Sequence, residues 1–323
     1  MKVVTVGTSA ITKRNIEEMR LAGIEVFACV SRDVEKAKKF ADENDVPRYS
    51  NNYEKVLLAN EYDFVYLGIP NSLHYNYAKK ALEHGKNVIV EKPFCLNQKQ
   101  ARDLLSIALS RKLYIFENMK TYHTKAYKAL LKDIDSIKPI KSVTLNYTKY
   151  SSRYDLFKAN LPQTIISNEY GSGALMDLNC YNISFALGLF GLPKTAAYYC
   201  NKQNDIDTSG IAVLTYDNFL VNCIAGKDSN ANCFADICGE KGHIYSNEDV
   251  SEFGSYTIFY NSGLNKEVNL KDDHQFVLMF NDFKNIYSNN NFYNYDYYMK
   301  LTLMEMKVLD DLRKSADIRF ISE

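Results

Sequence analysis

The sequence predicts an α/β domain with a doubly wound parallel sheet, followed by an α+β domain with a large, mostly antiparallel sheet. Up to residue 120, short β-branched or aromatic runs alternate with segments of helical periodicity, which is typical of βαβ units. After residue 120 the apolar runs become longer and are separated by short turn signals, which favours hairpins. We therefore expect two domains, residues 1–120 and 121–323.

In the first domain, β-branched and aromatic enrichment predicts five short strands, at residues 3–7, 25–31, 63–69, 87–91 and 113–116. Apolar residues at helical spacing predict the intervening helices, at residues 12–21, 34–43, 53–59, 72–84 and 98–110. Because a helix follows each of the first four strands, we expect the strands to be parallel, with their carboxyl ends at one edge of the sheet.

In the second domain a helix is expected over residues 123–137, ending before Pro139. The longer apolar runs predict strands at residues 140–150, 194–201, 211–216, 219–225, 233–239 and 256–260. An amphipathic helix at residues 173–190 interrupts these runs. Two closing helices are expected at residues 275–288 and 295–315.

Composition excludes several function classes. Lys plus Arg and Asp plus Glu are both 39, so the chain lacks the basic footprint of a nucleic-acid binder. No apolar run approaches the ~18 residues of a membrane span. Seven cysteines without a Cys-x-x-Cys motif indicate reduced thiols. We therefore expect a cytoplasmic protein that binds neither nucleic acid nor membrane, and no metal, because no histidine has metal-ligand spacing.

The first strand ends in a turn with the spacing of the dinucleotide-binding motif G-x-G-x-x-G, of which only Gly7 is kept. Ser9 is small enough for the second glycine position, whereas Thr12 suits the third less well. The alternative is a simple helix start capped by Thr8 or Ser9. The position between strand and helix favours a phosphate site at a helix N-terminus, formed by residues Gly7, Thr8, Ser9, Ala10 and Ile11.

The end of the second strand bears on cofactor choice. A site that prefers NAD places an acidic residue there to bind the ribose 2′-hydroxyl. This chain has Ser31 and Arg32, and a hydroxyl and a guanidinium suit a 2′-phosphate. We therefore expect NADP(H) rather than NAD(H), the alternative being an ordinary exposed arginine.

Two further strand ends carry polar residues. Pro70 would set a rigid turn after the third strand, and Asn71 would present its amide to the nicotinamide ribose, unless it is only a helix cap. Glu91 and Lys92 end a buried strand, where ligands of parallel sheets bind. The alternative for this pair is a solvated ion pair before a proline turn.

These segments, together with the run from Gly171 to Tyr181, resemble the Gfo/Idh/MocA family. The resemblance rests on the Gly7 turn, on Pro70-Asn71 with His74, on Glu91-Lys92-Pro93, and on Gly-Ser-Gly-Ala-Leu-Met-Asp-Leu-Asn-Cys-Tyr ending at Tyr181. It implies a Rossmann domain and an α+β domain whose open sheet often mediates oligomers. It also implies cofactor contacts at the first three of these segments, and a cis Lys92-Pro93 peptide as in some members.

By this resemblance Lys92 is the catalytic lysine, Asp177 orients the substrate and Tyr181 is the acid/base. Many members have His at the last position, although glucose–fructose oxidoreductase and dimeric dihydrodiol dehydrogenase are similar to this chain in using Tyr. Asp177 and Tyr181 are four residues apart and so share one face of a helix. A phenol of pKa ~10 needs help to act at neutral pH, and an ammonium such as that of Lys92 favours phenolate.

Two more residues are candidates for substrate binding, beside Lys92, Asp177 and Tyr181. Arg153 would pair with a substrate carboxylate or phosphate, a structural salt bridge being the alternative. His123 lies where the two expected domains follow one another in the chain.

The leading hypothesis is an NADP(H)-preferring oxidoreductase that transfers hydride to or from a secondary alcohol or carbonyl of a sugar, cyclitol or diol. The expected partners are a small polyol or sugar-like substrate and further copies of the chain, as a homodimer or homotetramer. The alternatives are a dinucleotide-binding regulator without turnover, and a relative that uses NAD to cleave glycosides.

Overall fold

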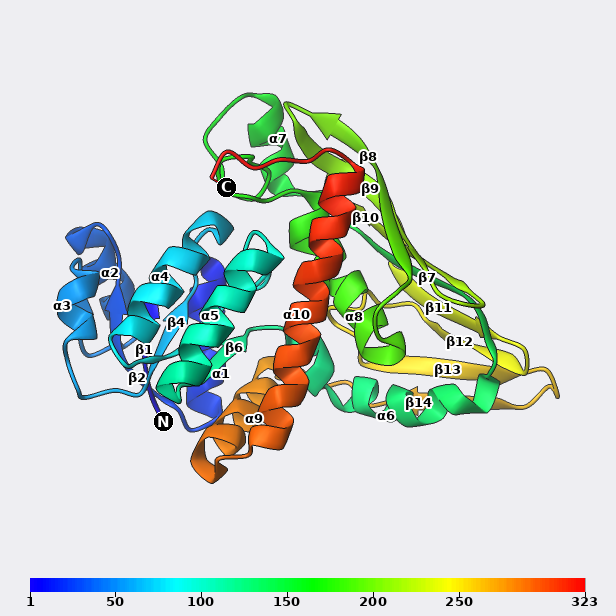
Figure 1. Ribbon diagram of the computed structural model, residues 1–323, viewed down its shortest axis with the longest axis horizontal. Helices are drawn as coiled ribbons and strands as arrows, with labels where there is room; N and C mark the ends of the chain where they lie inside the picture. Colours follow the sequence, from blue (N-terminus) through cyan, green and yellow to red (C-terminus); the bar gives the residue numbers. More distant parts are fainter. Residues whose placement is uncertain (323) are drawn as a thin grey trace. The chain divides into compact units, whose positions relative to one another are not determined.

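The computed structural model describes residues 1–322, which fold into two compact units (Figure 1). The first unit comprises residues 1–119 and 274–303, and the second comprises residues 120–273 and the chain from Met304 onward. This division differs from the expected boundaries, which assigned all of 121–323 to the second domain. The physical reason lies at α9 (Gln275–Asn289), where Glu18 of the first unit accepts a hydrogen bond from the Val277 amide at 3.2 Å.

The first unit is built on a six-stranded parallel sheet with the strand order β3-β2-β1-β4-β5-β6. Its strands are β1 (Lys2–Val6), β2 (Glu25–Val30), β3 (Tyr49–Ser50), β4 (Phe64–Leu67), β5 (Asn87–Val90) and β6 (Ile115–Glu117). The strand order reverses between β1 and β4, which is where ligands of such sheets bind. Strands β4 and β5 are buried along their whole length, as expected of parallel strands covered on both faces.

Side-chain caps start most helices of this unit. The helices are α1 (Ala10–Leu21), α2 (Val34–Glu43), α3 (Tyr53–Leu57), α4 (Asn71–Glu83), α5 (Gln98–Arg111), α9, and the first part of α10 (Phe292–Ser315). Ser9, Asp33, Asn52 and Asn97 each accept a backbone N–H at a helix start. These caps fix where the helices begin.

The second unit is built on an eight-stranded sheet with the order β14-β13-β12-β11-β7-β10-β9-β8. Only the β7–β10 pair is parallel. The strands are β7 (Ile140–Thr148), β8 (Thr195–Gln203), β9 (Ile206–Thr215), β10 (Leu220–Gly226), β11 (Phe234–Gly239), β12 (Gly242–Ser246), β13 (Ser255–Tyr260) and β14 (Asn265–Asn269). The predicted fold class is confirmed, although the sequence reasoning missed β3, β12 and β14.

Helices cover one face of this sheet. They are α6 (Lys125–Asp133), α7 (Ser152–Lys158) and α8 (Cys180–Phe190), together with the 3₁₀ turns η1 (Lys120–His123) and η2 (Ile134–Ile137) and a π-helical turn, η3 (Leu175–Asn179). Figure 1 shows α8 along the sheet, and two buried asparagines fix it there. Asn179 donates to the Cys223 carbonyl at 2.9 Å and Asn182 to the Ile224 carbonyl at 3.0 Å, both on β10.

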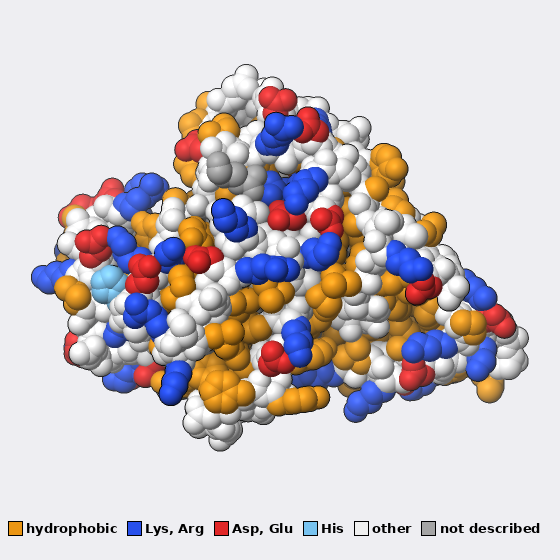
Figure 2. Space-filling model, in the orientation of Figure 1, with side chains coloured by type: hydrophobic (Ala, Val, Ile, Leu, Met, Phe, Trp, Pro, Cys, Tyr) orange, Lys and Arg blue, Asp and Glu red, His pale blue; other side chains and the backbone are white. Residues whose placement is uncertain are grey.

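Charges of both signs are interspersed on the face drawn in Figure 2. This distribution accompanies a formal net charge of zero, from 39 basic and 39 acidic residues. The face therefore offers no broad field of one sign to attract a highly charged partner.

Candidate active site

The turn after β1 requires glycine at Gly7. Its φ is +110°, and a Cβ there would lie 2.2 Å from the carbonyl oxygen of Gly68, which follows β4. Thr12 stands at the third glycine position, and its Oγ1 donates to the same carbonyl at 3.4 Å. A Cβ on Gly68 would lie 2.3 Å from Thr12 Oγ1. The close packing of helix on strand therefore uses Gly68, which follows the neighbouring strand, instead of a third glycine in the motif.

Ser9 caps α1 by accepting a hydrogen bond from the Thr12 amide at 3.3 Å, so one alternative drawn from the sequence, a capped helix start, is confirmed for Ser9. Thr8 and Ile11 are half-buried, and Ser9 and Ala10 are exposed. This stretch fits the phosphates of a dinucleotide, because open backbone at the N-terminus of a helix attracts anions.

The segment after β2 holds one carboxylate, and that carboxylate is already engaged. Asp33 Oδ1 accepts from the amides of Glu35 and Lys36 at 2.9 and 3.1 Å, capping α2. Arg32 is exposed and Ser31 is half-buried. The sequence prediction left out Asp33. Its position immediately before the helical segment 34–43 is the signal that marks it as a helix cap.

Glu91 lies inside the first unit, at the end of β5. Its Oε1 accepts from Tyr66 Oη at 2.6 Å and from the side-chain amides of Asn118 and Asn15. Burial raises the pKa of this carboxyl above its usual range, against the lowering effect of these hydrogen bonds. We therefore interpret Glu91 as support for the turn that carries Lys92.

Two more buried side chains hold the turn of Lys92. The Lys92-Pro93 peptide is cis, as expected. His74 places Nδ1 3.0 Å from the Pro93 carbonyl oxygen and Nε2 2.9 Å from that of Ile69, so it joins this turn to the one at Pro70. Glu117, at the end of β6, accepts a hydrogen bond from the Phe94 amide at 3.0 Å.

His74 was expected to contact the cofactor, but its side chain is fully buried. Asn71, also an expected cofactor contact, is half-buried as the first residue of α4.

In the second unit, Asp177 and Tyr181 lie where the π-turn η3 runs into α8. Both side chains are half-buried, whereas Asn179, Cys180 and Asn182 are buried against the sheet. Asp177 and Tyr181 are therefore less covered than Asn179, Cys180 and Asn182 on the same segment. The ring of Tyr147, on β7, lies 6.1 Å from that of Tyr181. Single π-turns inside helices are frequent at functional sites.

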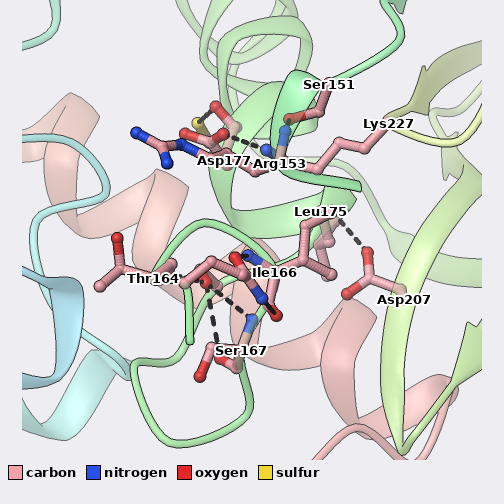
Figure 3. Close-up of polar contacts among 12 residues, drawn as sticks. Ser151, Arg153, Thr164, Ile166, Ser167, Leu175, Asp177, Asp207 and Lys227 are labelled. Atoms are coloured by element: carbon pink, nitrogen blue, oxygen red, sulfur yellow. Dashed lines mark hydrogen bonds and ion pairs between the residues drawn. The ribbon is translucent and has the colours of Figure 1, made fainter. Parts of the chain in front are cut away.

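Asp177 forms an ion pair with Lys227, which follows β10 and was not considered from the sequence (Figure 3). The Lys227 side chain is 2% exposed and that of Asp177 is 29% exposed. The same figure shows Asp207 directed at Leu175, whose amide it binds at 2.6 Å. No local sequence signal identifies Lys227 or Asp207, because each meets the helix through sheet pairing.

The two softer candidates lie in different surroundings. Arg153 is exposed in the first turn of α7, whose cap residue Ser151 donates its amide to the Lys227 carbonyl at 2.9 Å. His123 is buried in η1. The structure therefore links Arg153 to the strand end that carries Lys227.

Comparison with known proteins decides the family. The model of the oxidoreductase family with an NAD-binding Rossmann fold, Gfo/Idh/MocA, matches residues 1–119, and the model of the Gfo/Idh/MocA C-terminal domain matches residues 139–245. The chain belongs to the Gfo/Idh/MocA family. The predicted resemblance is confirmed, and with it an oxidoreductase of the dehydrogenase or reductase type that uses a nicotinamide nucleotide.

Among Gfo/Idh/MocA relatives, scyllo-inositol 2-dehydrogenase (NADP(+)) IolU of Bacillus subtilis is 34% identical over 243 residues, 74% of each chain. A trans-1,2-dihydrobenzene-1,2-diol dehydrogenase of Xenopus tropicalis is 27% identical, over 70% of this chain and 68% of that one. A solved 3-ketoreductase of Actinomadura kijaniata, in complex with NADP and TDP-benzene, has a TM-score of 0.84 at 22% identity, over 98% of this chain and 97% of that one. This last likeness concerns the fold alone.

Membership of Gfo/Idh/MocA leaves the individual site residues as predictions. Among residues 1–322, no helix is both long and apolar enough to cross a bilayer. In the same part of the chain, no three His, Cys, Asp or Glu side chains are grouped as metal ligands, and the expectation of no metal stays a prediction.

Proposed function

We propose that this protein is an NADP(H)-preferring oxidoreductase acting on a secondary alcohol or carbonyl of a sugar, cyclitol or related diol. The observation that carries the proposal is the pair Asp177 and Tyr181, which lie four residues apart and half-buried on a helical segment that is fixed to the sheet. A carboxylate and a phenol so placed suit a hydroxyl that loses a proton and a second hydroxyl beside it.

Each residue has a stated role. When bound, the nicotinamide accepts a hydride from a carbinol carbon or returns one to a carbonyl. Tyr181 takes the hydroxyl proton in oxidation and gives it back in reduction. Lys92 polarises the reacting oxygen and favours the phenolate form of Tyr181. Asp177 accepts a hydrogen bond from a neighbouring hydroxyl and so orients the ring.

The Asp177–Lys227 pair favours a neutral polyol over an acid. The Lys227 ammonium is buried, whereas the Asp177 carboxylate is partly exposed. A ligand therefore meets the carboxylate oxygen first. Hydroxyl groups donate to such an oxygen, whereas phosphate and carboxylate groups are repelled by it. The relatives named as acting on scyllo-inositol and on a dihydrodiol agree with this class.

For the cofactor, the segment after β2 supports NADP(H). Arg32 is an exposed cation, and the one carboxylate beside it, Asp33, is engaged in capping α2. A ribose 2′-phosphate suits this arrangement better than a 2′-hydroxyl. The relative from Bacillus subtilis carries NADP(+) in its name.

We further propose that the chain self-associates through the face of the eight-stranded sheet that carries Tyr199 and Ile211. These two residues are cross-strand partners, and Ile211 also pairs with Ile224. Tyr199 is 69% exposed and Ile211 is 42% exposed, an arrangement that a second copy of the same face would cover. A cytoplasmic location stays a prediction from composition.

The test is to measure NADPH and NADH binding by nicotinamide fluorescence in one buffer, and then oxidation of scyllo-inositol, xylose and a dihydrodiol. Tighter NADPH binding with turnover of one of these supports the proposal. Tighter NADH binding overturns the cofactor assignment alone. Binding without turnover of any polyol overturns the dehydrogenase assignment and points to a regulator or to glycoside cleavage.

A further inference from the structure

The environment of Lys227 is unusual for a lysine. Its side chain is 2% exposed, and within residues 1–322 the recorded acceptor for its ammonium is Asp177 Oδ2. Taking an ammonium out of water is costly unless it is paired. An apolar side chain of the same length would fill the same space without this cost, so the charge at Lys227 needs a reason.

Local folding does not supply the reason, because the backbone of Lys227 is held independently of its side chain. Its amide donates to the Thr208 carbonyl at 2.8 Å, and its carbonyl accepts from the Ser151 amide at 2.9 Å. The strand end is therefore fixed from both sides whatever side chain it carries. The ammonium of Lys227 adds the ion pair with the carboxylate of Asp177.

We propose that Lys227 is a positioning residue, which holds the carboxylate of Asp177 in the orientation that receives a substrate hydroxyl. A carboxylate on a helix can rotate about two side-chain bonds, and an ion pair from the neighbouring strand limits this freedom. This inference rests on the proposed function, because it assigns Lys227 to the polyol site and not to the cofactor.

A matched control lies beside Lys227 in the sheet. Strands β7 and β10 are parallel, and Thr148 pairs with Gly226, so Lys149 and Lys227 follow at equivalent positions. Lys149 is exposed, whereas Lys227 is buried. Lys149→Met removes a lysine charge at the equivalent end of the neighbouring strand β7, and we expect it to leave kcat and KM unchanged.

The experiment is a double-mutant cycle of Lys227→Met and Asp177→Asn on the full chain, read by steady-state kinetics with the polyol that the wild type oxidises best. Each single variant is expected to lower kcat/KM on the order of 10- to 100-fold, mainly through KM for the polyol. NADPH binding is expected to be unchanged. If Lys227 acts through Asp177, the double variant loses no more than Asp177→Asn alone.

Losses that multiply in the double variant, or a Lys227→Met enzyme as active as the wild type, would overturn the inference while leaving the proposed function intact. A wild type that binds NADPH but oxidises no polyol overturns the proposed function and this inference together. If Lys227→Met does not fold, Lys227→Gln replaces it in the cycle, because it keeps a hydrogen-bond donor and lacks the charge.

Discussion

The carboxylate of Asp207 occupies the space that a Cβ on Gly173 would need. That Cβ would lie 2.1 Å from Asp207 Oδ1. The other oxygen, Oδ2, accepts from the Leu175 amide at 2.6 Å and from Tyr198 Oη at 2.9 Å. Because Leu175 begins the π-turn that carries Asp177, a strand residue fixes the start of this segment. The second glycine of the Gly-Ser-Gly-Ala-Leu run is therefore a packing requirement.

We expect Gly173→Ala to destabilise the protein by about 1–3 kcal/mol, the usual cost of overpacking a buried site. Moving Asp207 aside would disturb its hydrogen bonds to the Leu175 amide and to Tyr198 Oη. The measurement is the free energy of unfolding in urea. Gly226→Ala is the control with a smaller expected loss, because its Cβ would meet a methyl group of Thr148 at 3.1 Å. Equal stability of Gly173→Ala and wild type would mean that Asp207 can move aside.

The sequence identified the helical half of the site but not the strand residues that support it. Asp177 and Tyr181 are four residues apart, and local periodicity alone places them on one side of a helix. Lys227 meets Asp177 only because β10 pairs in parallel with β7, a register that no local pattern encodes. The role of Asp207 could not be predicted for the same reason, since this residue of β9 binds the Leu175 amide across the fold.

For the fold as well, local patterns predicted the apolar strands but not the elements that depend on contacts between distant residues. The first-unit strands other than β3 consist mostly of β-branched, aromatic and other apolar residues, so the sequence predicts them directly, and the expected parallel sheet was confirmed. Strand β14 was missed because four of its five residues are exposed and polar. Residues 274–303 were assigned to the second domain because they follow it in the sequence. The sequence does not show that the Val277 amide, at the start of α9, donates a hydrogen bond to Glu18 of α1.

Tyr181→Phe is expected to lower kcat by about 10²–10⁴-fold, the range for loss of a general acid or base, while NADPH affinity stays the same. The ring is kept, so only the hydroxyl is lost. Tyr147→Phe is the matched control, because its ring lies 6.1 Å from that of Tyr181. Stopped-flow or steady-state absorbance of NADPH measures both variants. A Tyr181→Phe enzyme with wild-type turnover would remove Tyr181 from the chemistry.

Arg32→Ala is expected to weaken NADPH binding about tenfold or more and to leave NADH binding unchanged, because a charged hydrogen bond to the 2′-phosphate is lost. The cap of α2 is made by Asp33 and stays in place. Fluorescence titration with both nucleotides gives the ratio of the two dissociation constants. Lys38→Ala, an exposed cation farther along α2, is the control for general loss of charge. Equal weakening of both nucleotides would rule out a 2′-phosphate contact.

Ile211→Asp is expected to shift the protein toward monomers, because it places a charge in the centre of the proposed self-association face. Ile211 pairs with Tyr199 and Ile224 on this face. Sedimentation velocity at several concentrations gives the mass of the species present. Leu21→Asp, which changes an exposed apolar residue of α1, is the control expected to leave the mass unchanged. A wild type that sediments as a monomer at every concentration would contradict the proposal.

His74 predicts a specific pH dependence of stability. Burial lowers the pKa of His74 below its ordinary value of 6.5, against the effect of its hydrogen bonds to the carbonyls of Ile69 and Pro93. The imidazole is therefore neutral in the folded chain at a pH where it already binds a proton in the unfolded chain. Its contribution to stability is present above pH 6.5 and is lost as the pH falls below that value.

The measurement is the free energy of unfolding of wild type and His74→Asn between pH 7.5 and about 5.0. Below pH 6.5 the wild type is expected to lose up to ~1.4 kcal/mol per pH unit relative to the variant, which has no group to titrate at this position. His74→Asn is expected to be less stable at pH 7.5, because asparagine leaves part of the fully buried imidazole's space unfilled. If it does not fold, titration of the His74 ring by NMR in the wild type replaces the comparison. Parallel pH profiles, or a ring that titrates at 6.5 in the folded protein, would show that burial does not favour the neutral form.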